Sequence, residues 1–134
     1  MAKRIFISFN FHERNFRDNL TRFFQEFGGP VQATPVFVER DVTVPGRSKE
    51  ENDKAIEAEI RRLMQGCRGL IAVVGRDAHN SPWIDHELRE ADRLKIPKIA
   101  VKHPTFGGGV PNAHKYIKVV EWDPAAIARI VQGW

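Results

Sequence analysis

The segment "SPWIDHEL", residues 81–88, places a carboxylate where a helix should be apolar. Ser81 is a good N-cap, and Pro82 suits the first helical position. At roughly 100° per residue, Glu87 falls inside the apolar arc of this helix, close to Trp83. A carboxylate held there has a strong electric field because it is partly removed from water, and the helix N-terminus helps to keep it ionised. It could stabilise positive charge in a reaction. Alternatively, it pairs with an arginine or reaches past Trp83 to solvent.

The end of an earlier apolar run offers further groups that could hold a ligand. Ser8, Phe9 and Asn10 stand at the end of "RIFISF", whose β-branched and aromatic residues predict a buried strand. Their side chains or backbone N–H groups could bind a small molecule, although simple capping of the strand end explains the same residues. Gly75 closes a second apolar run, "GLIAVVG", and begins the loop that follows it.

Three more residues have both a functional and a structural interpretation. Arg40 and Asp41 open the loop "RDVTVPGRS", where they could lie over a ligand or form a solvated turn. Trp83 belongs to the first turn of the helix that carries Glu87, and it could be a platform for a ligand or part of the core. The residue types alone leave these alternatives open.

Side chains that bind metals or act as thiol nucleophiles show no pattern typical of such sites. The four histidines considered lack metal-site spacing; they are His79, His86, His103 and His114. Cys67 lies on a predicted apolar helical stripe. We therefore expect no metal, no resident cofactor and no cysteine nucleophile.

Strands and helices alternate along the whole chain. The expected strands are 4–9, 34–39, 69–75, 97–103 and 116–122, and the expected helices are 16–27, 48–67, 82–94 and 124–131. Ser48 and Glu51 form a capping box at the start of the second helix. Alternation of this kind predicts a parallel sheet with right-handed crossovers and helices on both faces. We therefore expect an α/β fold of the flavodoxin-like, three-layer type, with a central parallel sheet of about five strands.

The positions of the candidate residues agree with such a sheet. Strand order 2-1-3-4-5 is the commoner arrangement at this size, and it creates a crevice beyond the carboxyl ends of the first and third strands. The loops that open there begin at Phe9–Asn10 and at Gly75–Arg76. Glu87, in the helix after the third strand, would face the same crevice.

The length and composition of the chain indicate how many domains it has and which kinds of partner to expect. At 134 residues the chain is expected to be a single domain, 1–134, with a net charge of +4 from 21 basic and 17 acidic residues. The basic residues are scattered among acidic ones, so nucleic acid is not an expected partner. One cysteine suits a reducing compartment, and no apolar run approaches the ~20 residues that span a membrane. We expect a cytoplasmic protein without a membrane partner.

Three segments together resemble the TIR domain. "FISF" corresponds to the opening strand of that family, "RDVTVPG" resembles its Arg-Asp…Pro-Gly loop, and "LIAVVGRDAHNSPWIDHEL" resembles its strand followed by Ser-x-Trp-Cys-x-x-Glu-Leu. Their order and spacing agree over about the first hundred residues. Within this superfamily, "MAKRIFISFNFHER" and the closing "VEW" are most similar to the TIR-like proteins of Thoeris antiphage systems. Two departures are Ile84, in place of the common Cys, and Gly75, where many members have Ser.

The resemblance implies an enzyme that consumes NAD as its substrate. The glutamate of the Trp-x-x-x-Glu box is the catalytic residue of enzymatic TIR domains, and that position is Glu87 here. Ser8, Phe9, Asn10, Arg40, Asp41, Gly75 and Trp83 are then the expected substrate-binding residues. Resemblance to the Thoeris proteins further implies NAD nucleosidase or ADP-ribosyl cyclase chemistry, giving a cyclic or conjugated ADP-ribose signal that activates an effector protein.

Two other classes of function compete with this interpretation. A non-catalytic TIR adaptor would act by homotypic assembly, as a homo-oligomer, with Glu87 vestigial. A receiver-like phosphoacceptor would need an acidic pair after the first strand, and Asn10-Phe11-His12 stands there instead, which argues against it.

Overall fold

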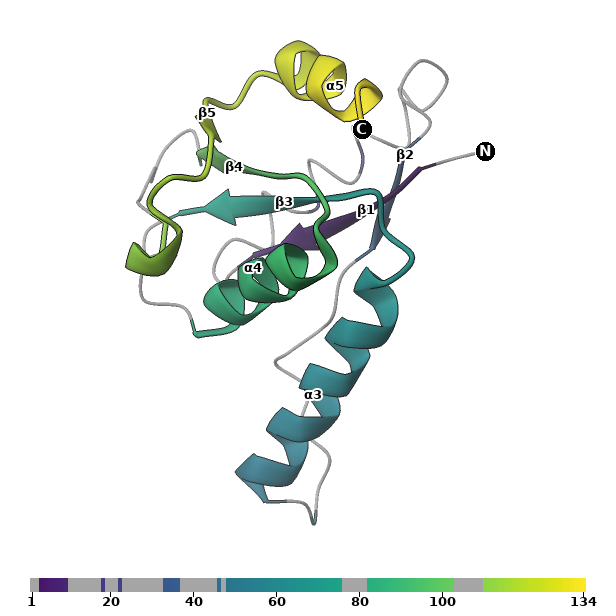
Figure 1. Ribbon diagram of the computed structural model, residues 1–134, viewed down its shortest axis with the longest axis vertical. Coiled ribbons are helices and arrows are strands. Elements are labelled where there is room, and N and C mark those ends of the chain that lie inside the picture. The colour runs from purple at the N-terminus through teal and green to yellow at the C-terminus, as the bar shows by residue number, and fades with distance from the viewer. Residues whose placement is uncertain are drawn as a thin grey trace.

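The computed structural model describes residues 3–9, 18, 22, 33–36, 46, 48–75, 82–102 and 110–134. Its centre is a five-stranded sheet in the order β2-β1-β3-β4-β5 (Figure 1). The strands are β1 (Lys3–Ser8), β2 (Ala33–Val36), β3 (Gly69–Val74), β4 (Lys98–Lys102) and β5 (Val119–Val120). All neighbouring strands are parallel. The predicted fold class and strand order are confirmed.

Helices cover both faces of this sheet. α3 (Lys49–Met64) and α4 (Pro82–Leu94) lie on one face, and α5 (Pro124–Gln132) lies on the other (Figure 1). A short 3₁₀ helix, η3 (Asn112–His114), precedes β5. Of the helix expected over 16–27, only Asp18 and Arg22 are described, and both are helical. The fifth strand is shorter than the run 116–122 that the sequence predicts.

The predicted start of α3 is confirmed, with one difference in detail. The backbone N–H of Glu51 donates to Ser48 Oγ at 3.1 Å. The Ser48 hydroxyl in turn donates to the Glu51 carboxylate at 3.1 Å, in place of the backbone N–H that a standard capping box uses. Acidic residues in this first turn complement the positive end of the helix.

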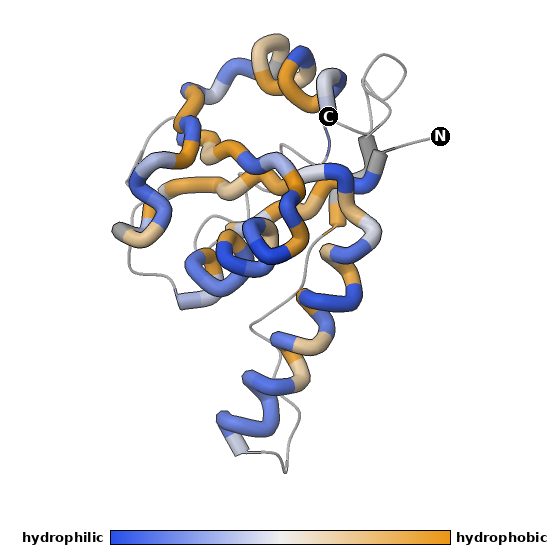
Figure 2. Tube along the Cα trace, viewed as in Figure 1, coloured by the Kyte–Doolittle hydropathy of each residue, from blue (hydrophilic) through white to orange (hydrophobic). Residues whose placement is uncertain are grey.

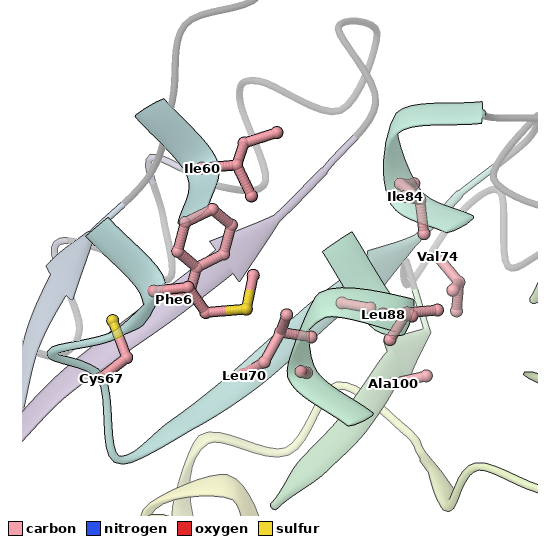
Figure 3. Packing of buried hydrophobic residues seen from close by; sticks show 11 residues of the cluster. Phe6, Ile60, Cys67, Leu70, Val74, Ile84, Leu88 and Ala100 are labelled. Atoms are coloured by element: carbon pink, nitrogen blue, oxygen red, sulfur yellow. The ribbon is translucent and has the colours of Figure 1, made fainter. Parts of the chain in front are cut away.

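Alternation along the strands divides the buried residues into two cores. The α5-side core joins α5 to residues such as Ile5, Ile7 and Val73. The α4-side core joins α3 and α4 to the opposite faces of the same strands, and its members include Phe6, Leu70, Val74, Ile84 and Leu88 (Figure 3). Apolar residues accordingly line the central strands and the inner sides of the helices, with hydrophilic residues outside (Figure 2). Among the described residues, no helix is both long and apolar enough to cross a membrane.

The thiol of Cys67 should be unreactive in the folded protein. Its side chain is buried beside the end of α3, where Sγ lies 3.4 Å from the carbonyl oxygen of Leu63. Burial raises the pKa of the Cys67 thiol to about 11, against a smaller opposing effect of the Arg4 charge. At pH 8 we expect alkylation at least ~100-fold slower than that of a free cysteine, because the thiolate is the reactive form. Mass spectrometry after timed exposure to iodoacetamide, with and without guanidinium, measures this; rapid labelling of the native protein would contradict it.

Candidate functional site

Glu87 lies on the side of α4 that faces the sheet, as its place on the helical wheel predicts. The residue is 1% exposed, although it is a carboxylate one turn and a half into the helix. Its Oε1 accepts a hydrogen bond of 2.8 Å from the Ser8 hydroxyl. Burial of a charged group costs free energy unless hydrogen bonds compensate, and the Ser8 hydroxyl is one group that does so.

Strand alternation explains why Ser8 reaches Glu87. Phe6 belongs to the α4-side core, so Ser8, two residues later, points to the same face and lies beneath α4. Ser8 pairs with Ala72 of β3 and is fully buried. Phe9 points the other way, and its side chain packs in the α5-side core. Of these two predicted binding residues, Ser8 lies beside Glu87, while the Phe9 side chain is on the opposite face of the sheet.

Two further predicted site residues lie near the same end of the sheet. Gly75 is buried directly after the last residue of β3. Trp83, in the first turn of α4, is half-buried and packs against the α4-side core. Its ring meets His86 edge to face, with 5.9 Å between the centroids. Trp83 therefore has a core contact and a partly exposed surface at once.

Asn10, Arg40 and Asp41 lie outside the described residues. Their predicted contacts with a substrate remain predictions.

A pocket of about 430 Å³ opens between α3 and α4. The described residues that line it are Lys49, Asp53, Glu57, Pro82, Trp83, His86 and Arg89, and Glu87 is not among them. On the helical wheel, Trp83 stands between the flank of α4 that faces this pocket and the side that carries Glu87. Trp83 thus lines the pocket and is the pocket residue nearest to Glu87 on the helical wheel.

A second buried carboxylate on α4, Glu90, is not among the residues predicted from the sequence. It is 6% exposed, forms an ion pair with Arg93, and lies 3.7 Å from Arg61 of α3. The hydrogen bond from Arg93 lowers the pKa of Glu90, and the Arg61 charge acts in the same direction. The i, i+3 spacing of Glu90 and Arg93 was the available signal. This carboxylate links α4 to α3.

A buried histidine links η3 to the first turn of α4. His114 Nε2 lies 2.9 Å from Asp85 Oδ1, and the His114 side chain is 4% exposed. Asp85 also pairs with Arg89 at 3.0 Å. The contact between His114 and Asp85 holds η3 against the first turn of α4, which precedes Glu87. Among the described residues, no group of three or more His, Cys, Asp or Glu is placed to hold a metal ion.

A protein-family model matches most of the chain. The family described as "Thoeris protein ThsB, TIR-like domain" matches residues 6–106, a span that includes Ser8, Gly75, Trp83 and Glu87. The chain belongs to this family. The comparison with curated proteins finds no match.

Solved TIR domains share the fold of this TIR-like chain. The TIR domain of the Toll-related receptor TRR-2 from Hydra magnipapillata is similar with a TM-score of 0.57 and 17% identity, over 95% of this chain and 90% of that one. The RPS4 and RRS1 TIR domain heterodimer gives a TM-score of 0.54 and 10% identity, over 99% of this chain and 94% of that one. At these identities the likeness concerns the fold alone.

Proposed function

We propose that this TIR-like protein is an enzyme that cleaves the bond between nicotinamide and ribose in NAD. The observation that carries the proposal is the Glu87 carboxylate, 1% exposed and hydrogen-bonded by Ser8 at the carboxyl end of β1. In open α/β sheets, ligands bind beyond the carboxyl ends of the strands. Membership of the Thoeris TIR-like family supports the same site.

The chemistry of the reaction suits a fixed carboxylate. The bond from C1′ to the pyridinium nitrogen breaks, and its electron pair leaves with neutral nicotinamide. The remaining ribosyl group resembles an oxocarbenium ion, whose positive charge a nearby carboxylate stabilises. Water or another nucleophile then bonds to C1′ and releases its proton to solvent. Because the leaving group is already neutral, the enzyme needs little acid catalysis, and Glu87 can act as an anion that accepts hydrogen bonds from the ribose hydroxyls.

The positions of the two buried carboxylates of α4 favour Glu87 over Glu90 for this role, because Glu87 faces the sheet and Glu90 faces α3. Arg93 and Arg61, both largely exposed, approach Glu90, and their positive charges offset its negative charge. Glu87 instead lies against the sheet at the carboxyl end of β1, where the Ser8 hydroxyl donates a hydrogen bond to the carboxylate and where open α/β sheets bind ligands. A water-excluded carboxylate in that position exerts a stronger field on a cationic transition state.

Nicotinamide release tests the proposal directly. Pure protein at high concentration is incubated with NAD, alone and with extract from phage-infected cells, and nicotinamide is measured by chromatography. We expect release of nicotinamide in equal amount to the NAD consumed. No release under either condition would favour a non-catalytic adaptor that acts by assembly.

The nucleotide product of this reaction determines which partner protein responds. We propose that the ADP-ribose group is cyclised or joined to another molecule, and that the resulting signal activates an effector protein in bacterial antiphage immunity. Such a diffusible nucleotide requires neither a membrane nor nucleic acid as a partner, and it suits a cytoplasmic enzyme. Mass spectrometry of the reaction mixture distinguishes free ADP-ribose from a cyclic or conjugated product.

A further inference from the structure

The hydrogen bond between Ser8 and Glu87 joins residues that are 79 positions apart in the chain. Both side chains are closed to solvent, with Ser8 0% and Glu87 1% exposed. A serine hydroxyl has a single proton to donate. Because Ser8 gives this proton to Oε1 of Glu87 at 2.8 Å, the proton is not free for a hydroxyl of the substrate.

Ser8 is a rigid anchor. It ends β1, which pairs with β2 on one side and β3 on the other, and its own partner in β3 is Ala72. The short side chain therefore holds Oγ at a position set by the sheet. Glu87 has a longer and more flexible side chain, so a hydrogen bond to one carboxylate oxygen restricts where the other oxygen lies.

We propose that Ser8 is a positioning residue, which orients the Glu87 carboxylate and does not itself bind the substrate. This inference rests on the proposed NAD cleavage and changes the role that the sequence predicts for Ser8. Substrate binding and positioning have different kinetic signatures. Loss of a substrate ligand raises KM, whereas a misplaced carboxylate weakens stabilisation of the transition state and lowers kcat.

Three substitutions at position 8 separate the hydrogen bond from the packing. Ser8→Ala removes the donor, and we expect kcat to fall about 10- to 100-fold with KM within about twofold, since small misplacements of catalytic groups have effects of this size. Ser8→Cys keeps the unbranched side chain, with a somewhat larger sulfur in place of the oxygen, but donates weakly, so it should resemble the alanine variant. Ser8→Thr keeps the hydroxyl and should recover most of kcat.

The outcomes distinguish failure of this inference from failure of the proposed function. A wild-type protein that releases no nicotinamide overturns the proposed function, and the positioning role with it. An active wild type whose Ser8→Ala variant has a raised KM and an unchanged kcat overturns the positioning role alone. Full activity of Ser8→Ala does the same.

A stability measurement checks the contact without using NAD. Melting temperatures are compared for wild type, Ser8→Ala, Glu87→Met and the double variant, which form a double-mutant cycle. We expect the effect of Ser8→Ala to become smaller once the carboxylate is absent. Strictly additive shifts would show that the two side chains are not coupled, and would overturn the inference.

Discussion

The substitution Glu87→Gln should lower NAD cleavage by at least ~100-fold, the scale lost with one preorganised charge-stabilising group. The melting temperature should stay level or rise. Glu87 is 1% exposed, so its ionised form carries a desolvation cost that the neutral amide avoids. The amide oxygen can still accept the hydrogen bond from Ser8, which preserves the local geometry. Nicotinamide release and thermal melting are measured on the same purified variant.

Glu90→Gln is a matched control, because it makes the same change in the same helix at a residue that is also buried. Glu90→Gln should lower the stability of the protein, because the amide pairs more weakly with Arg93 and Arg61 than the carboxylate does. We expect a melting temperature a few degrees lower. NAD cleavage should stay within about twofold of wild type, because the substitution leaves the Glu87 carboxylate and its field intact.

The contribution of Glu90 to the stability of the folded protein should depend on pH. Pairing with arginine lowers the pKa of Glu90 in the folded state, so its stabilising contribution is present at neutral pH and is lost as the pH falls through that pKa. The difference in melting temperature between wild type and Glu90→Gln should therefore shrink in acid.

A Glu87→Gln protein that is destabilised but still active would reject the catalytic assignment. Equal activity losses in both variants would point to the helix and not to one carboxylate.

The sheet and the burial of Glu87 could be predicted because both depend on local periodicity. An uninterrupted apolar run predicts a central strand, and β3 is buried throughout. The 3.6-residue period of α4 places Glu87 toward the sheet, and the structure has it there. Alternation along β1 also contains the information that Ser8 and Phe9 face opposite ways, although their common position at the strand end suggested a common role.

What the sequence could not supply is the packing between elements. On the helical wheel Glu90 lies at the edge of the apolar arc, and its burial results from contact with α3, which brings Arg61 within 3.7 Å. The link between His114 and Asp85 joins residues 29 positions apart, on η3 and α4. The pocket between α3 and α4 likewise depends on how two helices cross. No local period encodes these distances.

A side chain at Gly69, at the start of β3, should destabilise the protein while Trp134 is in place. A Cβ at position 69 would lie 2.8 Å from Cδ2 of the Trp134 indole and closer still to two other ring carbons. The Trp134 ring packs against the α5-side core, so Gly69→Ala must displace a residue with core contacts. We expect a loss of about 1–3 kcal/mol, typical of overpacking, which lowers the melting temperature by roughly 4–11 °C in a chain of this size.

Two further variants show whether the indole is the cause. Gly66→Ala brings a Cβ to 2.8 Å from the end of the Arg4 side chain, which is flexible and can move aside, so its effect should be small. In a Trp134→Ala background the obstacle at position 69 is absent. Gly69→Ala should then be neutral or slightly stabilising, since alanine has a lower entropy cost than glycine in a strand. A full loss of stability in that background would place the cause in the strand backbone instead of the indole contact.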